Sequence, residues 1–224
     1  MEISKEQLLQ IDQYMLGCGV NFQDVRSELV DHFASILEKK LDESPKLDFK
    51  KEIQNIHSAF KDKGFKNLLK EKTKSVQKRF YKQSLEHLIT FFKLPKILIT
   101  VAFFCVLFWF MRFLEDTATF FFVLSGVLIF LGFRLLFNVN MRNSKKDTFL
   151  VLNMTLYFFN VFYACVLIFN FVADATNETY FLSFTTNTIK LAIFVLLLLF
   201  YWSGEYVYYQ NKKEIQKQYP NTVL

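Results

Sequence analysis

Four long apolar segments follow one another in the C-terminal half of the chain, and they limit its fold more than any other feature. They cover residues 97–114, 118–137, 149–172 and 188–209. An α-helix rises about 1.5 Å per residue, so roughly 20 apolar residues cross the hydrocarbon of a bilayer. The rest of the chain is too short to bury four such helices in a soluble core. The sequence therefore predicts an all-α integral membrane protein with a four-helix transmembrane bundle at 97–211.

Composition agrees with helices, because Gly and Pro are too scarce for a fold rich in turns. The first and fourth segments have short charge-free centres, bounded by Arg112, Lys190 and Glu205. We expect these three residues near the membrane interfaces, with the basic side chains reaching outward to water.

The distribution of Lys and Arg predicts the orientation of the spans. Basic residues gather before the first segment, between the second and third, and after the fourth, whereas the connections at 115–117 and 173–187 contain none. This pattern places both termini in the cytoplasm. The first residues lack a basic start and an apolar run, so we expect the first span to direct insertion. The chain then lies in the cytoplasmic (inner) membrane, with 212–224 as a cytoplasmic tail.

Residues 1–64 predict a small cytoplasmic bundle of three amphipathic helices. Ser4 and Gln7 have the spacing of a capping box at the start of the first helix. Asn21 can cap the second helix and Asp48 the third, which Gly64 would end. So small a bundle has marginal stability alone, so we expect it to need the next helix, the membrane or a partner.

Residues 65–96 predict a basic amphipathic helix next to the membrane, ended by Pro95. Five of its lysines recur every four residues: Lys66, Lys70, Lys74, Lys78 and Lys82. Such a ridge is either a solvated face or a surface that attracts anionic lipid headgroups of the cytoplasmic leaflet. Direct nucleic-acid binding is not expected, because a reading motif and interleaved aromatic residues are both missing.

Glu28, Asp31 and His32 place carboxylates and an imidazole within one turn of the second helix. The spacing could serve a metal ion or a general base, with His57 joining from another helix. One short helix offers few ligands, so a solvated polar face that contacts a partner is the favoured interpretation. We expect no catalytic, cofactor-binding or metal-binding residues, and the sequence does not predict an enzyme.

Polar residues also occur within the spans. Asn153, Tyr157 and Asn160 share one face of the third span, and an asparagine in hydrocarbon is costly unless paired. We therefore expect this face to point into the bundle, either for interhelical hydrogen bonds or as the lining of a small pathway. Arg134 and Glu205 have similar depths in the second and fourth spans, which suggests an ion pair between them.

The N-terminal region resembles a known family. Residues 24–33 read DVRSELVDHF, followed by LEKKL at 37–41 and GFKNLL at 64–69. This pattern is similar to the HAAS-type helical domain, and to small membrane proteins of Bacteroidota. Such domains precede membrane spans in bacterial proteins often encoded beside PadR-type transcriptional regulators. The resemblance implies regulation or signalling at the membrane, with a PadR-type regulator as a candidate partner, and not catalysis.

Two functions follow as hypotheses. The first is a membrane-anchored regulatory or interaction protein whose cytoplasmic helices bind a soluble partner. The second is a small transporter or channel subunit that uses the polar face of the third span. The oligomeric state stays open, with a homo-oligomer among the alternatives.

Overall fold

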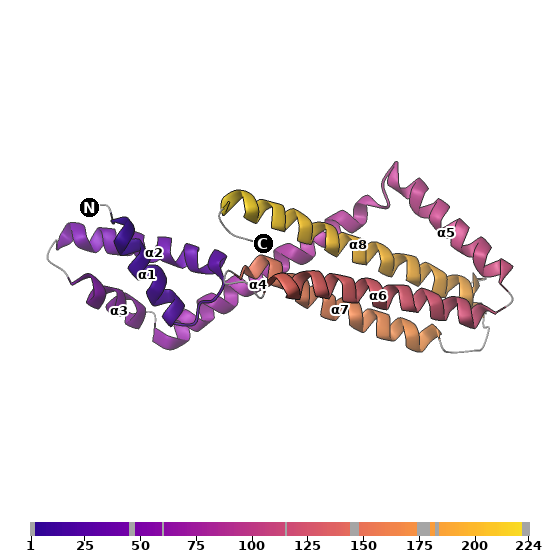
Figure 1. Cartoon of the computed structure of the whole chain (residues 1–224), viewed down its shortest axis with the longest axis horizontal. Helices are drawn as coiled ribbons and strands as arrows, with labels where there is room; N and C mark the ends of the chain where they lie inside the picture. The colour runs from indigo at the N-terminus through magenta and orange to yellow at the C-terminus, as the bar shows by residue number, and fades with distance from the viewer. Residues whose placement is uncertain are drawn as a thin grey trace. The chain divides into compact units, whose positions relative to one another are not determined.

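The computed structural model describes residues 3–44, 48–59, 61–114, 116–143, 148–173, 180–181 and 184–220. Within these ranges the chain is almost entirely α-helical (Figure 1). Contacts divide it into two compact units, one of residues 1–78 with 145–153, the other of residues 79–144 with 154–222.

The first unit contains three helices before residue 60: α1 (Lys5–Gly17), α2 (Gln23–Glu43) and α3 (Phe49–Ala59). α1 and α2 pack together, and α3 packs against α2. Their apolar stripes meet in a core of fully buried side chains, chiefly Ile11, Met15, Phe33, Leu37, Ile53 and Ile56. The three predicted amphipathic helices are therefore present, and each buries the face that its periodicity indicates.

The helix ends agree with the predictions in part. Ser4 and Gln7 form the predicted capping box, and Asp48 Oδ1 accepts the Lys50 N–H at 3.1 Å. The prediction for Asn21 is wrong: Phe22 is the N-cap of α2 and provides no side-chain cap. Gly64 does not end a helix either, because it lies inside α4 (Lys61–Thr90).

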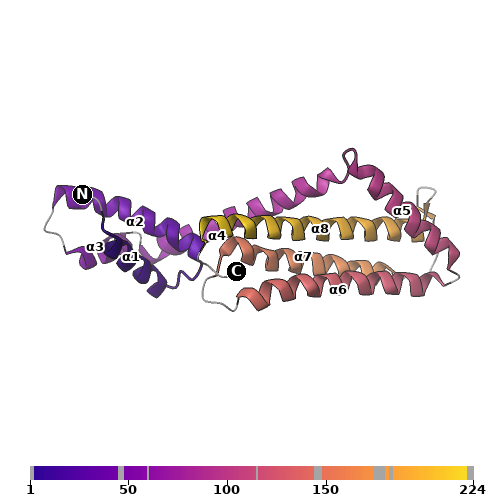
Figure 2. The same cartoon turned by 45° about the horizontal axis from the view of Figure 1, so that its top comes forward.

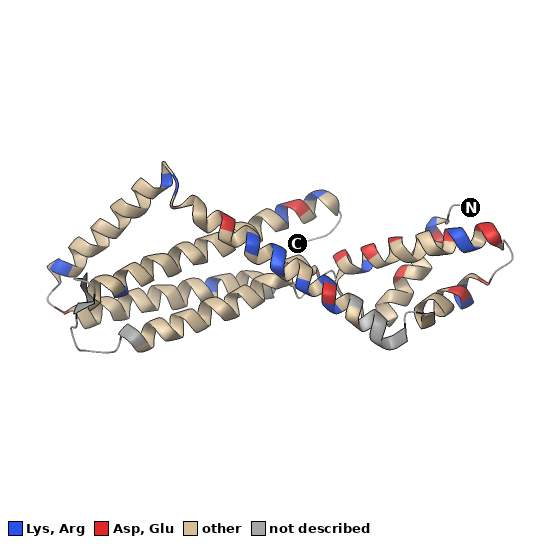
Figure 3. Ribbon diagram, turned by 180° about the vertical axis from the view of Figure 1, so that it is seen from behind, with Lys and Arg blue, Asp and Glu red and all other residues tan. Residues whose placement is uncertain are grey.

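α4 extends from the first unit into the second and ends at Thr90, before the predicted end at Pro95. Pro95 is instead the N-cap residue of α5 (Lys96–Phe113). Four of the ridge lysines, Lys70, Lys74, Lys78 and Lys82, have exposed side chains. The side chain of Lys66 lies outside the described part of the chain. Figure 3 shows charged residues along α1 to α4 and at the end of α8, with few on α5 to α7.

The second unit holds four helices long and apolar enough to cross a membrane: α5, α6 (Thr117–Asn143), α7 (Leu150–Ala173) and α8 (Thr186–Gln218). Each overlaps one predicted segment, so the prediction of four membrane-spanning helices is confirmed by length and composition. The first residues of α7, up to Asn153, belong to the first unit. Between α7 and α8, strands β1 (Tyr180–Phe181) and β2 (Phe184–Thr185) pair antiparallel.

α6 and α5 both pack against α8. The buried face of the bundle is built from large side chains on three helices, among them Leu128, Leu135, Phe158, Phe162, Leu191 and Tyr201. Among the described residues of α5, Met111 is the one that is buried, and in Figures 1 and 2 α5 lies apart from α7. Apart from its contact with α8, this helix presents much of its apolar surface to its surroundings, as expected of a span in contact with lipid.

Two expectations about the ends of α8 are corrected by the structure. The predicted tail, 212–224, continues the helix as far as Gln218. Lys190 does not reach outward, since only 5% of it is exposed. Its ammonium lies 5.8 Å from the centre of the Phe121 ring, where the face of the aromatic ring attracts the cation.

Candidate partner-binding site on helix α2

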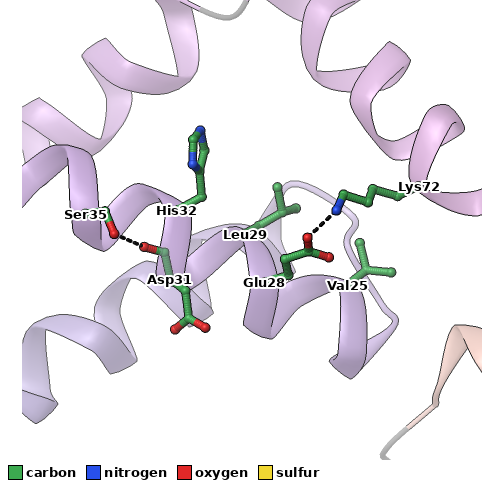
Figure 4. A pocket seen from close by; sticks show the side chains of 7 residues that line it. All are labelled: Val25, Glu28, Leu29, Asp31, His32, Ser35 and Lys72. Carbon is green, nitrogen blue, oxygen red and sulfur yellow. Dashed lines mark hydrogen bonds and ion pairs between the residues drawn. The ribbon is translucent and has the colours of Figure 1, made fainter. Parts of the chain in front are cut away.

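A pocket of about 440 Å³ lies between α2 and α4 in the first unit (Figure 4). Residues four apart lie on the same face of a helix, and in α2 this brings Val25, Leu29 and the polar residues beside them to one surface. The pocket is lined by Val25, Glu28, Leu29, Asp31, His32, Ser35 and Lys72. All three residues singled out from the sequence, Glu28, Asp31 and His32, therefore line one pocket.

Lys72 of α4 completes this lining, although no pattern in the sequence distinguishes it from the neighbouring lysines. Its ammonium pairs with the Glu28 carboxylate across the pocket. The Lys72 side chain is 42% exposed and that of Glu28 60%, so water screens the pair and it contributes no more than about 1 kcal/mol. The pair can therefore open for a competing charged group at little energetic cost.

Asp31 and His32 lie side by side in the sequence but point away from each other in Figure 4. Ser35 Oγ donates a hydrogen bond of 2.9 Å to the backbone carbonyl oxygen of Asp31 and not to its carboxylate. The Asp31 carboxylate therefore lies at the rim of the pocket. Across the described ranges, no three His, Cys, Asp or Glu side chains gather as a metal site. The arrangement is suited to contact with another molecule's polar groups.

His57 does not join this group, which corrects the expectation that it might. Its Nδ1 lies 2.8 Å from the Tyr14 hydroxyl and 4.0 Å from Cys18 Sγ, between α1 and α3. Burial raises the pKa of the Cys18 thiol, although the Tyr14 hydroxyl partly opposes this shift. A thiol with a raised pKa is a poor nucleophile at neutral pH.

Asp24, one turn before Glu28, connects α2 to the beginning of α7. Its Oδ1 accepts the Leu150 N–H at 2.9 Å and its Oδ2 accepts the Val151 N–H at 3.2 Å. Beside it, the Gln23 N–H donates to the Thr148 carbonyl at 2.8 Å, and Thr148 Oγ1 donates to the Asn21 carbonyl at 3.0 Å. A carboxylate at a helix N-terminus satisfies amides that have no partner within the helix and opposes the positive end of the dipole.

The predicted pair of Arg134 and Glu205 is present and links α6 to α8. Arg134 Nε also donates to the Tyr201 hydroxyl at 3.3 Å. Further along the spans, Ser125 of α6 hydrogen-bonds Asn170 of α7. These polar side chains thus find partners on neighbouring helices, as expected where water is absent.

The predicted inward face of α7 is wrong. Tyr157 and Asn160 are exposed, and Asn153 is half-buried. The opposite face enters the bundle and consists mainly of large apolar side chains: Met154, Phe158, Phe162, Val166 and Phe169. Phenylalanine fills more of the space between helices than asparagine, so packing decides which face turns inward.

Comparison of the chain with models of protein families, with curated proteins and with solved structures finds no match.

Proposed function

We propose that the chain is a membrane-anchored regulatory protein whose N-terminal helices bind a soluble protein on the cytoplasmic side of the membrane. The observation that carries this proposal is the pocket between α2 and α4, which lies in the unit that precedes the membrane helices. The positive-inside pattern of Lys and Arg supports a cytoplasmic position for this unit.

The lining of the pocket indicates the chemistry of the partner. Val25 and Leu29 provide an apolar surface, while Glu28 and Asp31 add carboxylates at the rim. A protein segment with one apolar anchor beside Lys or Arg matches this combination, because the anchor is desolvated and the charges pair at the edge. A basic side chain of the partner would compete with Lys72 for Glu28.

Asp24 gives a route by which partner binding would reach the membrane. It lies one turn from the pocket and holds the first amides of α7. A partner that displaces or stiffens the start of α2 therefore changes how firmly the beginning of the third span is held. The resemblance to HAAS-type domains makes a PadR-type regulator the first partner to test.

The alternative of a small transporter or channel subunit has less support. It relied on Asn153, Tyr157 and Asn160 as an internal polar lining, and Tyr157 and Asn160 are on the outer face of α7. Flux of small solutes into liposomes that disappears in Asn160→Leu would bring this alternative back.

The test of partner binding is affinity purification of the full-length protein from membranes in mild detergent. Asp31→Lys reverses a rim charge on the pocket, and Glu6→Lys makes the same change on the exposed surface of α1. We expect a soluble protein to co-purify with the wild type and Glu6→Lys and to be lost with Asp31→Lys. Recovery of no partner by the wild type, or equal recovery by all three, would refute the proposal.

A further inference from the structure

The outer face of α7 carries a regular pattern that the fold of one chain does not use. Tyr157, Asn160, Ala164, Leu167 and Phe171 are all exposed. Their spacing alternates between three and four residues, so they form one stripe along the helix, opposite its buried face. This spacing is that of the contact positions in two helices that coil around each other.

Asn160 lies near the middle of α7 (Leu150–Ala173), at the depth where hydrocarbon would surround it. Within the described part of the chain, its amide has no hydrogen-bond partner. A carboxamide left unpaired in an apolar medium costs several kcal/mol. Ser125 and Asn170 show the alternative in the same chain, since these two polar side chains pair between α6 and α7.

We propose that the Tyr157–Asn160–Ala164–Leu167–Phe171 stripe of α7 is a contact surface for a second copy of this chain, with Asn160 hydrogen-bonded to Asn160 of that copy. Copies in one membrane share an orientation, so a two-fold axis along the membrane normal brings equal positions of α7 to equal depth. An asparagine amide both donates and accepts, so it is its own complement across such an axis.

The other residues of the stripe fit a close approach of two helices. Ala164 follows Asn160 by one turn and has a small side chain, which allows the two helix backbones to come near each other. Leu167 and Phe171 are 51% and 85% exposed and supply apolar surface on the following turns. A single buried polar residue within an apolar seam also fixes register, because a shifted pairing would leave both amides unsatisfied. This inference is independent of a soluble partner for α2.

Cysteine cross-linking of the full-length protein in lipid vesicles tests the contact. In a background without Cys18, Cys105 and Cys165, Ala164→Cys places a thiol on the stripe, and Phe130→Cys places one on the exposed surface of α6. We expect Ala164→Cys to give a disulfide-linked dimer, and the yield of this dimer should persist when more lipid is added before oxidation. Phe130→Cys should give no dimer. Equal yields from both, no dimer from Ala164→Cys, or cross-links in cells only to another membrane protein would overturn the proposal.

The role of Asn160 is measured separately, by energy transfer between labelled copies at decreasing protein-to-lipid ratios. Asn160→Leu should weaken self-association roughly three- to twentyfold, the range expected for a polar contact between membrane helices. Phe130→Leu, on the exposed surface of α6 and away from the stripe, should leave self-association unchanged. Undiminished association of Asn160→Leu would overturn the pairing of the two Asn160 side chains. The cross-linking test with Ala164→Cys does not depend on whether Asn160→Leu folds.

Discussion

At the scale of single residues, carboxylates of α2 and α3 accept hydrogen bonds that hold segments of the first unit together. Asp24 binds two amides of α7, and Glu52 accepts hydrogen bonds from Lys40 and from Asn55, the latter at 2.9 Å. Each carboxylate satisfies donors that would otherwise compete for water. Removing either one should therefore have an effect beyond the loss of a surface charge.

Asp24→Ala should release the beginning of α7. The loss of a helix cap costs about 1 kcal/mol, so the amides of Leu150 and Val151 should exchange with deuterium about fivefold faster. Asp24→Asn retains an acceptor oxygen and should have a smaller effect. Asp31→Ala, which removes an exposed carboxylate of the same helix, is the control and should leave these amides unchanged.

Glu52 should make the first unit sensitive to acid. Hydrogen bonds from Lys40, and then from Asn55, lower the pKa of this carboxyl in the folded protein. Ionised Glu52 therefore stabilises the fold above the pKa of the unfolded chain, and this stabilisation is lost as pH falls through the lowered folded pKa.

Glu52→Gln should reduce amide protection in α2 and α3 at neutral pH by about 1 kcal/mol. The difference from the wild type should vanish in acid, once Glu52 is protonated. Glu43→Gln removes a charge from the exposed end of α2. It should leave amide protection unchanged both at neutral pH and in acid. A difference between wild type and Glu52→Gln that is independent of pH would contradict the assignment.

Near the pocket, the sequence allowed contacts to be predicted only between residues that are close together in the chain. Glu28, Asp31 and His32 share a pocket because residues three and four apart share a helix face. Lys72 and the amides held by Asp24 could not be found in this way, since their contacts depend on how distant segments pack. Arg134 and Glu205 were predictable as a pair because charges at similar depth in hydrocarbon have few other partners.

At the scale of helices, α7 and α8 depend on a close approach at Gly204. A methyl group on this glycine would overlap the ring of Phe158, whose Cδ1 would lie 2.7 Å away. Phe158 is itself fully buried, so its ring has no space into which to move. Gly204 is therefore required by packing, because a larger residue at this position would not leave room for Phe158.

Gly204→Ala should destabilise the membrane helices by about 1–3 kcal/mol, because it overpacks a full interface. Gly126→Ala on α6 is the matched control: its added methyl group would meet nothing within 4 Å. Unfolding in mixed detergent micelles measures both variants. Equal stability of the two variants would show that α7 and α8 do not approach at Gly204.

The ion pair between α6 and α8 should be recoverable by exchange of its partners. Arg134→Glu or Glu205→Arg alone leaves two like charges together and should lower the yield of folded protein. The double exchange restores opposite charges and should recover most of that yield, measured by size-exclusion chromatography in detergent. A double variant as poor as either single variant would refute the pairing.

The spans were predictable because about 20 apolar residues in succession have no other stable solution in so short a chain. Which face of α7 turns inward was not, since a membrane removes the usual rule that polar residues lie outside. Lipid is as apolar as the interior of the bundle, so the shape and size of side chains decide which face of a helix is buried. In α7 the face with Phe158 and Phe162 is buried and the face with Asn160 is not. Gly64 was misjudged because a single glycine costs only about 1 kcal/mol inside a helix.

At the scale of the whole molecule, the orientation of the four spans is the prediction on which the proposed function depends. Alkaline phosphatase inserted into the 173–187 connection should be active, because that enzyme needs an oxidising compartment outside the cytoplasm. A fluorescent protein fused at the C-terminus should fold and emit light. A phosphatase inserted into the 144–147 connection is the control and should be inactive. The reversed result would place the α2 pocket outside the cell and end the proposal of a cytoplasmic partner.

α8 is longer than a bilayer requires. Its 33 residues form a rod about 50 Å long, of which about 30 Å suffices to cross hydrocarbon. Arg79 of α4 lies 3.9 Å from Glu214, near the far end of this rod. Because the helix does not break at the membrane surface, a small tilt of the span becomes a larger sideways displacement of its charged end. The displacement of a fluorophore at Lys217 would therefore report the tilt angle of the fourth span.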